Sequence, residues 1–325
     1  MICFYFLVLN YFIVLCQSTV EMNVSISNCT VNVDDDDYYY ANTDLLQTEA
    51  NKVRTTIYYV PYMVRLLKKR KTTCSGSIIN ASWILTAAHC LPHSRKLDSI
   101  EIMAGVDDVE DYRKAQFAMA KRVIQHPNYI PSKISKYDLG LIELVEPLNL
   151  SSTVQVLPLT NNSWPSTERL YSQPCLAAGW GTDKIVPGGV RKLRTLNVLA
   201  KHGDEACSCW RSFHNRRLIC LAEPGKGICH GDTGGPLVCD GKGVGVAHAL
   251  YRRDTCQMFH VGPTPVTCKD STSTYMYLCP ELSWIKQYVS NVPETPLTCK
   301  GTQTIFYLNA LLTGIITVFV INKPY

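Results

Sequence analysis

The chain has 325 residues, of which 46% are hydrophobic and 18% are charged, so it can bury a substantial core. Its length suits two domains, although a single all-β domain often reaches about 200–250 residues. The formal net charge of +5 is spread along the chain, and the one dense basic run, Lys68 to Lys71, is typical of a solvated loop. The composition therefore indicates a folded protein and argues against a nucleic-acid partner.

Residues 1–18 are almost wholly apolar and favour a signal peptide, although the usual positive charge before the apolar run is missing. A signal anchor is the alternative interpretation. Fifteen cysteines, two of them within this segment, indicate an oxidising compartment. Five N-x-[ST] glycosylation sites agree with export, starting at Asn23, Asn28, Asn80, Asn149 and Asn161. We therefore predict that the chain enters the secretory pathway.

Residues 19–56 form an acidic, polar leader in which Asp34–Asp37 directly precede Tyr38–Tyr40. Acidic residues beside tyrosines favour tyrosine sulfation. A disordered, solvated segment is the alternative interpretation, since such a composition buries little apolar surface. Either interpretation places the start of the folded domain after the leader.

From residue 57 the sequence changes, and short runs rich in Val, Ile, Leu and Tyr alternate with turn residues. This rhythm predicts an all-β barrel or sandwich, and we expect the domain to extend over 57–292. One helix is expected near its end, over 280–289, because Leu282, Ile285 and Val289 repeat at helical spacing.

A second apolar stretch covers residues 305–321, behind a short linker at 293–304. A spanning helix needs about 17–25 apolar residues, so a short transmembrane anchor is one interpretation. An apolar tail behind a polar spacer is also typical of a glycosylphosphatidylinositol attachment signal, which is later removed. A buried core helix is the third interpretation, although no polar face is visible. We expect the protein to be secreted or held at the outer face of the plasma membrane.

Three local sequence motifs contain candidate catalytic residues, and their order along the chain is informative. The first, WILTAAHC, places His89 at the end of an apolar strand. The second, YDLGLIEL, places Asp138 directly before another apolar strand. The third, GICHGDTGGPLVC, contains Thr233. Each motif alone is commonly structural, but the order histidine, aspartate and then hydroxyl at these spacings is typical of a hydrolase triad.

These motifs resemble those of the chymotrypsin/trypsin-like serine proteases. The similarity extends over about 59–289 and includes PYMVRL, TAAHC, AGWG, GDTGGP and the SWIKQ segment. It implies a chymotrypsin-like double six-stranded antiparallel β-barrel with a C-terminal helix. It also implies that His89 is the general base and that Asp138 holds its tautomer. The backbone N–H groups of Gly231 and Thr233 would form the oxyanion hole, and Asp232 would pair with a new N-terminus made by proteolytic activation.

Position 233 departs from the family, which has serine where this chain has threonine. The added methyl group restricts the χ1 rotation of Thr233 and must occupy space where the family has a hydrogen. Threonine nucleophiles are activated by their own N-terminal amine, and Thr233 is internal. The stretch near 43–50 also lacks the basic residue and the paired glycines that usually begin the domain. We therefore expect Asp232 to lack its usual cation.

The substrate pocket departs from the family as well. By resemblance, its lining is formed by Gly227, His230, His248, Ala249, Leu250 and Ser273. Gly227 stands at the pocket floor in place of an acidic residue, which argues against Lys/Arg specificity. Leu250 stands where the family has a glycine that admits the substrate side chain, so we expect it to narrow the pocket. His248 replaces a serine that supports the aspartate, so it is expected to perturb Asp138.

The resemblance also implies a disulfide framework, namely Cys74–Cys90, Cys175–Cys239, Cys229–Cys256 and Cys207–Cys220, with Cys209 as the alternative partner of Cys220. It assigns no partner to Cys29, Cys268, Cys279 and Cys299, nor to whichever of Cys207 and Cys209 is left over. The sequence contains no H-E-x-x-H motif and no phosphate-binding glycine loop, so no metal or cofactor is expected.

These departures indicate a protease homologue that is impaired or inactive and that binds a protein or regulates proteolysis. The first alternative is an endopeptidase that uses Thr233, His89 and Asp138 on a peptide substrate. The second is an adhesion or receptor-like surface protein that uses exposed loops such as 252–269.

Overall fold

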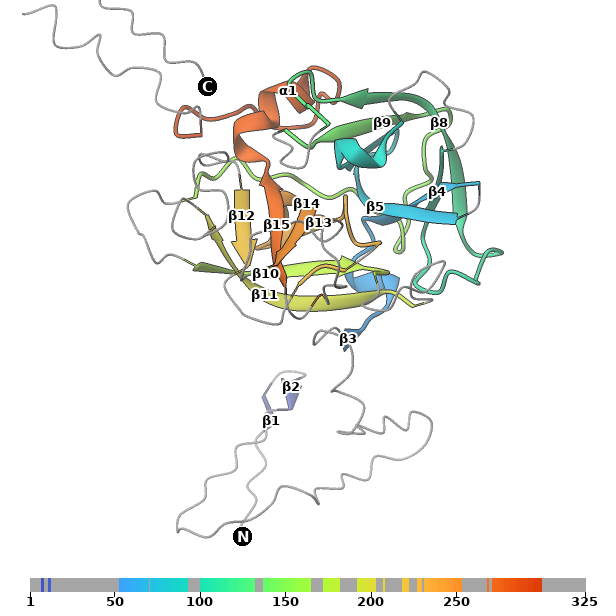
Figure 1. Cartoon of the computed structure of the whole chain (residues 1–325). Helices are drawn as coiled ribbons and strands as arrows, with labels where there is room; N and C mark the ends of the chain where they lie inside the picture. Colours follow the sequence, from blue (N-terminus) through green and yellow to red (C-terminus); the bar gives the residue numbers. More distant parts are fainter. Residues whose placement is uncertain are drawn as a thin grey trace, which may run out of the picture. The chain divides into compact units, whose positions relative to one another are not determined.

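The computed structural model describes most of the predicted domain (Figure 1). The described residues are 7–8, 11–12, 53–69, 71–92, 100–131, 137–164, 172–181, 192–202, 207, 218–221, 227–229, 231–252, 268 and 271–299. The chain divides into two compact units, residues 1–43 and residues 44–325. In the first unit, strand β1 (Leu7–Val8) pairs antiparallel with β2 (Tyr11–Phe12). The rest of the expected signal peptide, most of the leader and the apolar tail lie outside the described residues.

The first barrel contains six antiparallel strands and closes on itself in the order β4-β5-β6-β9-β8-β7. The strands are β4 (Met63–Lys68), β5 (Lys71–Asn80), β6 (Trp83–Thr86), β7 (Ile100–Ala104), β8 (Gln116–Gln125) and β9 (Gly140–Leu144). On β8, Ala118 and Ala120 are buried while Phe117 and Met119 are exposed. This alternation follows from the two-residue period of a strand with one face toward the core.

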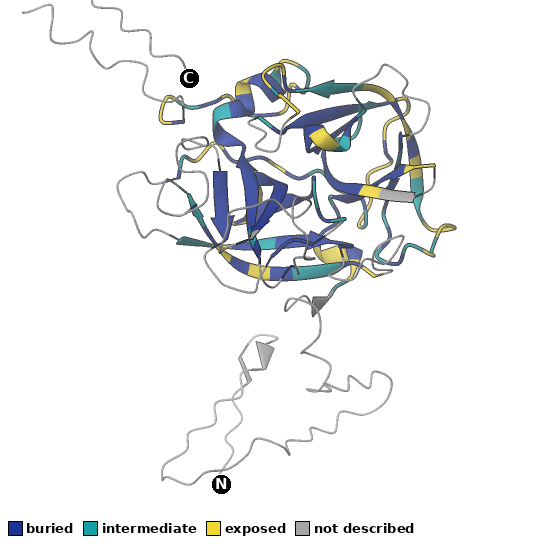
Figure 2. Cartoon of the chain, in the orientation of Figure 1, coloured by how far each residue is buried: buried dark blue, intermediate teal, exposed yellow. Residues whose placement is uncertain are grey.

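The second barrel also has six antiparallel strands. They are β10 (Ser172–Gly179), β11 (Arg194–His202), β12 (Leu218–Leu221), β13 (Pro236–Cys239), β14 (Lys242–Arg252) and β15 (Ser271–Tyr277). They pair in the order β10-β13-β14-β15-β12-β11, and pairing of β10 with β11 closes the ring. Buried residues line the strands of both barrels (Figure 2). The predicted double six-stranded barrel is therefore confirmed.

A short strand, β3 (Val53–Arg54), pairs antiparallel with the start of β11. Thr55 N donates to the Leu193 carbonyl oxygen at 3.2 Å, which extends this attachment. Residues 53–56 were expected to belong to the leader. They belong to the domain instead, because their backbone completes hydrogen bonds at an edge of the second barrel.

The C-terminal helix is shorter than predicted. The 3₁₀ turn η5 (Cys279–Glu281) leads into α1 (Leu282–Lys286), in place of one helix over 280–289. Pro280 lies in the first turn, where its missing backbone N–H costs no helical hydrogen bond. Ser283 and Thr295 exchange two side chain–backbone hydrogen bonds of 2.9 and 3.1 Å, which turn the chain back over the helix. Among the described residues no helix is both long and apolar enough to cross a membrane.

Candidate active site

His89 and Asp138 lie at the ends of two paired strands of the first barrel, β6 and β9. The 3₁₀ turn η3 (Ala88–Cys90) follows β6 and carries His89, and Asp138 lies just before β9. His89 N donates to Asp138 Oδ1 at 2.8 Å, and His89 Nδ1 lies 2.6 Å from Asp138 Oδ2. The carboxylate is fully buried. These two bonds fix the ring orientation and leave His89 Nε2 as the nitrogen that can exchange protons.

A second imidazole binds the same carboxylate oxygen. His248, on β14, places Nδ1 2.6 Å from Asp138 Oδ2, and the Tyr251 hydroxyl lies 3.3 Å from His248 Nε2. Both His248 and Tyr251 are buried. The sequence indicated that His248 would stand near Asp138, but only the structure shows that two histidines share one oxygen. Tyr251 carried no signal in the sequence.

The electrostatics of this group follow from burial and from the shared hydrogen bonds. Burial alone would raise the pKa of Asp138, but the hydrogen bonds and charges of His248 and His89 outweigh it and lower that pKa well below its usual range. For His89, burial works toward a lower pKa, while the hydrogen bond and charge of Asp138 raise it overall. Burial raises the pKa of Tyr251.

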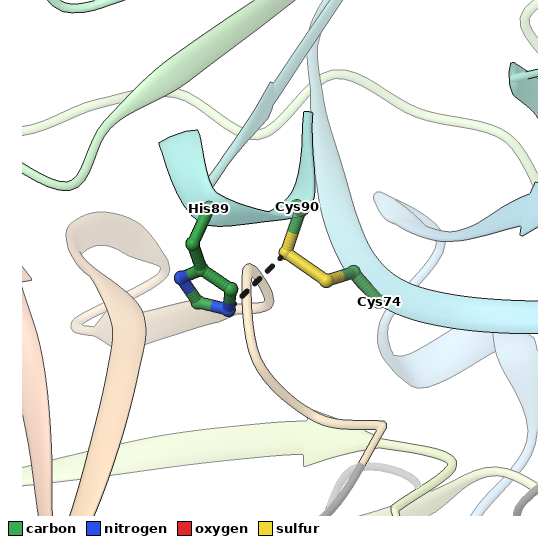
Figure 3. Close-up of side chains that lie close together, drawn as sticks. All are labelled: Cys74, His89 and Cys90. Carbon is green, nitrogen blue, oxygen red and sulfur yellow. Dashed lines mark hydrogen bonds between the residues drawn. A yellow bond between two sulfur atoms is a disulfide. The ribbon is translucent and has the colours of Figure 1, made fainter. Parts of the chain in front are cut away.

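Thr233 lies beside this pair but does not complete a hydrogen-bonded triad. Its Oγ1 is 3.7 Å from Cys74 Sγ, and His89 Nε2 is 3.6 Å from Cys90 Sγ. Cys74 and Cys90 form a disulfide bond (Figure 3). No hydrogen bond joins His89 to Thr233, both of which are described. The nucleophile–base contact that acyl transfer needs is therefore absent between these two residues.

The loop before β13 is nevertheless well ordered by hydrogen bonds. Gly231 has a φ of +96°, which only glycine adopts without strain, and Ser75 Oγ donates to its carbonyl oxygen at 2.7 Å. The buried Asp232 carboxylate accepts hydrogen bonds from the N–H groups of Gly181 and Cys229, both at 2.7 Å. A side chain at position 181 would overlap this carboxylate, so the glycine is required there.

The charge of Asp232 also acts on a cationic side chain of the domain. Burial lowers the pKa of Arg194, and the charge of Asp232 partly opposes that shift, so the two groups attract each other. Arg194 begins β11 and was not singled out as a site residue, because no local motif marks it. Arg194 is a different cation from the new N-terminus, so the expectation that Asp232 lacks its usual cation stays a prediction.

The expected pocket residues lie on neighbouring segments of the second barrel. Ser273 Oγ accepts a hydrogen bond from Ile228 N at 2.9 Å, and a side chain at Gly227 would overlap the Ser273 hydroxyl. Leu250 on β14 is the cross-strand partner of Ser273 on β15. Leu250 is buried in a core cluster that includes residues of both barrels, with Ala249 buried beside it. His230 lies outside the described residues. That Leu250 narrows the pocket stays a prediction.

Comparison with known proteins identifies the family. The family model described as Trypsin matches residues 50–261. Rat Trypsin-4 is 31% identical over 243 residues, which cover 71% of this chain and 86% of that protein. Rat submandibular glandular kallikrein-9 is 28% identical over 68% of this chain and 83% of its own. This chain belongs to the trypsin family.

The solved structure of neuropsin, a serine protease expressed in the limbic system of mouse brain, shares the fold of this trypsin-family chain. The two superimpose with a TM-score of 0.60 at 22% identity, covering 73% of this chain and 97% of that one. At that identity the likeness concerns the fold. The fold and the family are thus shown, and the roles of individual site residues rest on their geometry.

Three of the implied disulfides are present in this trypsin-family domain, namely Cys74–Cys90, Cys175–Cys239 and Cys207–Cys220. The expected Cys229–Cys256 pair is wrong. Cys229 pairs with Cys268, at a Cα separation of 5.5 Å, because the approach to β15 brings position 268 beside it. A fifth pair, Cys279–Cys299, was unassigned from the sequence. Cys29, Cys209 and Cys256 lie outside the described residues.

His89, Asp138 and His248 also form the kind of cluster that could hold a metal ion. Their ligand atoms lie within 4.8 Å of one another. Each imidazole Nδ1 already stands at hydrogen-bond distance from Asp138 Oδ2, however, and those two bonds account for the arrangement. The three side chains therefore form a hydrogen-bonded unit.

The buried Asp138 predicts a loss of stability in acid. The pKa of Asp138 in the folded chain lies below its unfolded value of about 3.9. Its contribution to stability is therefore complete above the unfolded pKa and is lost as the pH falls toward the folded pKa. We expect this group alone to remove on the order of 2 kcal/mol of unfolding free energy between about pH 5 and pH 2. Denaturant titrations at several pH values would measure it. An Asp138→Asn chain with an unchanged acid dependence would contradict this assignment.

Proposed function

We propose that this trypsin-family domain does not cleave peptide bonds at a useful rate and instead binds a protein, as a regulator of proteolysis. The observation that carries the proposal is the position of the Thr233 hydroxyl, which faces Cys74 Sγ at 3.7 Å while His89 Nε2 faces the other sulfur. Misplacing a reacting atom by about 1 Å can reduce the rate about a hundredfold. Without a working nucleophile, a site of this kind retains little more than binding.

The methyl group of Thr233 supports this proposal. Cys74, with which its side chain is in contact, belongs to β5, and Ser75 N on that strand donates to the Thr233 carbonyl oxygen at 2.8 Å. The backbone of Thr233 is thus held by a neighbouring strand. A β-branched side chain on a fixed backbone has few χ1 alternatives, so its hydroxyl cannot turn freely toward His89.

We propose that the protein acts outside the cell. Five disulfide bonds among the described residues support an oxidising compartment. The apolar segments at 1–18 and 305–321 support export and membrane attachment by a transmembrane helix or a lipid anchor. In this proposal the domain presents a folded, catalytically silent surface to other secreted or surface proteins.

The second candidate function is a slow endopeptidase that uses Thr233. It is favoured by the His89–Asp138 pair, which is complete and has its carboxylate fully buried. The base and its orienting carboxylate are present, so this candidate requires the Thr233 hydroxyl to turn from Cys74 Sγ toward His89. The two candidates therefore differ in one measurable property, the reactivity of the hydroxyl at position 233.

The test is labelling of the purified full-length chain with a fluorophosphonate probe, which reacts with activated hydroxyl nucleophiles. Wild type is expected to label no more than Thr233→Ala. Labelling of wild type that is lost in Thr233→Ala would overturn the proposal and establish the endopeptidase. The binding role is tested by adding wild type to an active trypsin-family protease and its protein substrate. A change in the cleavage rate is expected, and binding to cells without any such change would support an adhesion protein instead.

A further inference from the structure

The Cys74–Cys90 disulfide contacts both of the groups that a hydrolytic site would join. His89 Nε2 lies 3.6 Å from Cys90 Sγ, and Thr233 Oγ1 lies 3.7 Å from Cys74 Sγ. Figure 3 shows the His89 ring and Cys74 on different sides of Cys90 Sγ. Cys90 Sγ therefore faces an imidazole and, at 3.9 Å, the Thr233 carbonyl oxygen, whereas Cys74 Sγ faces the Thr233 hydroxyl.

The two cysteines differ in their access to solvent. Cys90 is half-buried, whereas Cys74 is buried. The His89 side chain is 37% exposed, so a small molecule can reach the Cys90 side of the bond next to the imidazole. Thiol–disulfide exchange requires an incoming thiolate that attacks one sulfur of the disulfide, and it is favoured when the other, leaving sulfur is stabilised. The exposed side of this disulfide has a base, and its buried side has a hydroxyl donor.

We propose that the Cys74–Cys90 disulfide is a thiol-reactive site in which His89 activates an incoming thiol and Thr233 stabilises the sulfur that leaves. The chemical class of the ligand is a small monothiol, and Cys90 is the residue that it modifies. This activity is separate from the proposed protein binding and from any hydrolysis. It assigns a task to the threonine that replaces the family's serine.

The protonation state of His89 suits the first step. Its Nδ1 is held by Asp138, whose carboxylate also accepts a hydrogen bond from His248. The Tyr251 hydroxyl lies beside His248 Nε2. These are the described titratable groups that face the imidazole from β9 and β14. Nε2 is left to take a proton from a thiol beside Cys90. Asp138 raises the pKa of His89, so the resulting imidazolium is stabilised.

The exchange takes place in two successive thiol attacks. The thiol R–SH transfers its proton to His89 Nε2, and the thiolate forms an R–S–S bond at Cys90 Sγ. The Cys74–Cys90 bond breaks, and its electron pair goes to Cys74 Sγ, which accepts a hydrogen bond from Thr233 Oγ1. A second thiol gives its proton through solvent to the Cys74 thiolate, attacks the added sulfur and releases R–S–S–R, while the imidazolium returns its proton to Cys90. Two thiols are oxidised to one disulfide, and the protein disulfide is reduced to two thiols.

The chain contains its own reference disulfide. Cys175 and Cys239 are both buried, and Cys175 Sγ lies 3.4 Å from the backbone carbonyl oxygen of Gln173. This bond therefore has a neutral backbone neighbour where the Cys74–Cys90 bond has an imidazole. Comparing the two bonds in one sample removes differences in thiol concentration, temperature and overall unfolding.

The test exposes the full-length protein to reduced glutathione and traps free thiols by differential alkylation, with each cysteine quantified by mass spectrometry over time. Cys74–Cys90 is expected to open at least about tenfold faster than Cys175–Cys239. His89→Gln is expected to reduce that advantage about tenfold, and Thr233→Val to reduce it several-fold. Thr153→Val, a half-buried threonine like Thr233 and far from the disulfide in the sequence, is the matched control and is expected to change neither rate.

A pH series on wild type keeps the proposal testable if a variant does not fold. The ratio of the two opening rates is expected to fall between about pH 6 and pH 9, because His89 helps only while the thiol, with a pKa near 8.5, is still protonated. Equal opening rates for the two bonds would overturn the proposal. So would a pH-independent ratio, or an unchanged rate in a folded His89→Gln chain.

Discussion

Replacing Thr233 with serine is expected to raise fluorophosphonate labelling of the full-length chain about a hundredfold over wild type. Serine lacks the methyl group, so its hydroxyl can rotate away from Cys74 Sγ, which the threonine oxygen contacts at 3.7 Å. His89 is already oriented by Asp138 through hydrogen bonds of 2.8 and 2.6 Å. The base and its support are thus in place, and the substitution supplies the group they lack.

The control for this gain is Thr153→Ser, the same substitution at another half-buried position, which should label like wild type. Mass spectrometry of the labelled peptide must place the probe on residue 233. A Thr233→Ser chain that keeps its disulfides and still fails to label would show that the threonine is not the only defect. In that case the pocket around Leu250 or the missing activation segment also silences the site.

The second large effect is expected at Asp232. Replacement by alanine should lower the free energy of unfolding by about 3–5 kcal/mol, because it leaves buried donors without their charged acceptor. The N–H groups of Gly181 and Cys229 both donate to this carboxylate at 2.7 Å, and Arg194 loses a nearby opposite charge. Chemical denaturation at neutral pH would measure the change.

Glu146→Ala is the matched control for Asp232→Ala, since Glu146 is exposed and its loss should change the unfolding free energy by no more than about 0.5 kcal/mol. In a Thr233→Ser background, Asp232→Ala is also expected to abolish the gained labelling, because the loop that carries residue 233 loses its anchor. Similar stability of the two alanine variants would rule out a structural role for the Asp232 hydrogen bonds.

The fold and the backbone of the site could be predicted because their signals are local. His89, Asp138 and Thr233 each lie in a short motif, and the motifs come in a fixed order. The spacing of turns predicted β-structure, and the resemblance predicted two barrels. The direction of the Thr233 hydroxyl could not be predicted, since it depends on a contact with Cys74, 159 positions earlier in the chain.

Other features failed to show in the sequence for the same reason. Arg194 acts on Asp232 only after β11 has been placed, and nothing beside it in the sequence marks that role. The resemblance paired Cys229 with Cys256, whereas in the folded chain the partner is Cys268, just before β15. Local patterns thus predicted elements and motifs, whereas long-range packing decided which atoms meet.

The Cys279–Cys299 disulfide has a mechanical consequence. It joins the start of η5 to the last described residue, a separation of 20 positions that includes α1. A pulling force applied beyond residue 299 would pass through the covalent bridge to Cys279 and on to β15. The helix and the turn held by Ser283 and Thr295 would carry none of that load. The C-terminal segment should therefore resist unravelling under tension for as long as this bridge stays oxidised.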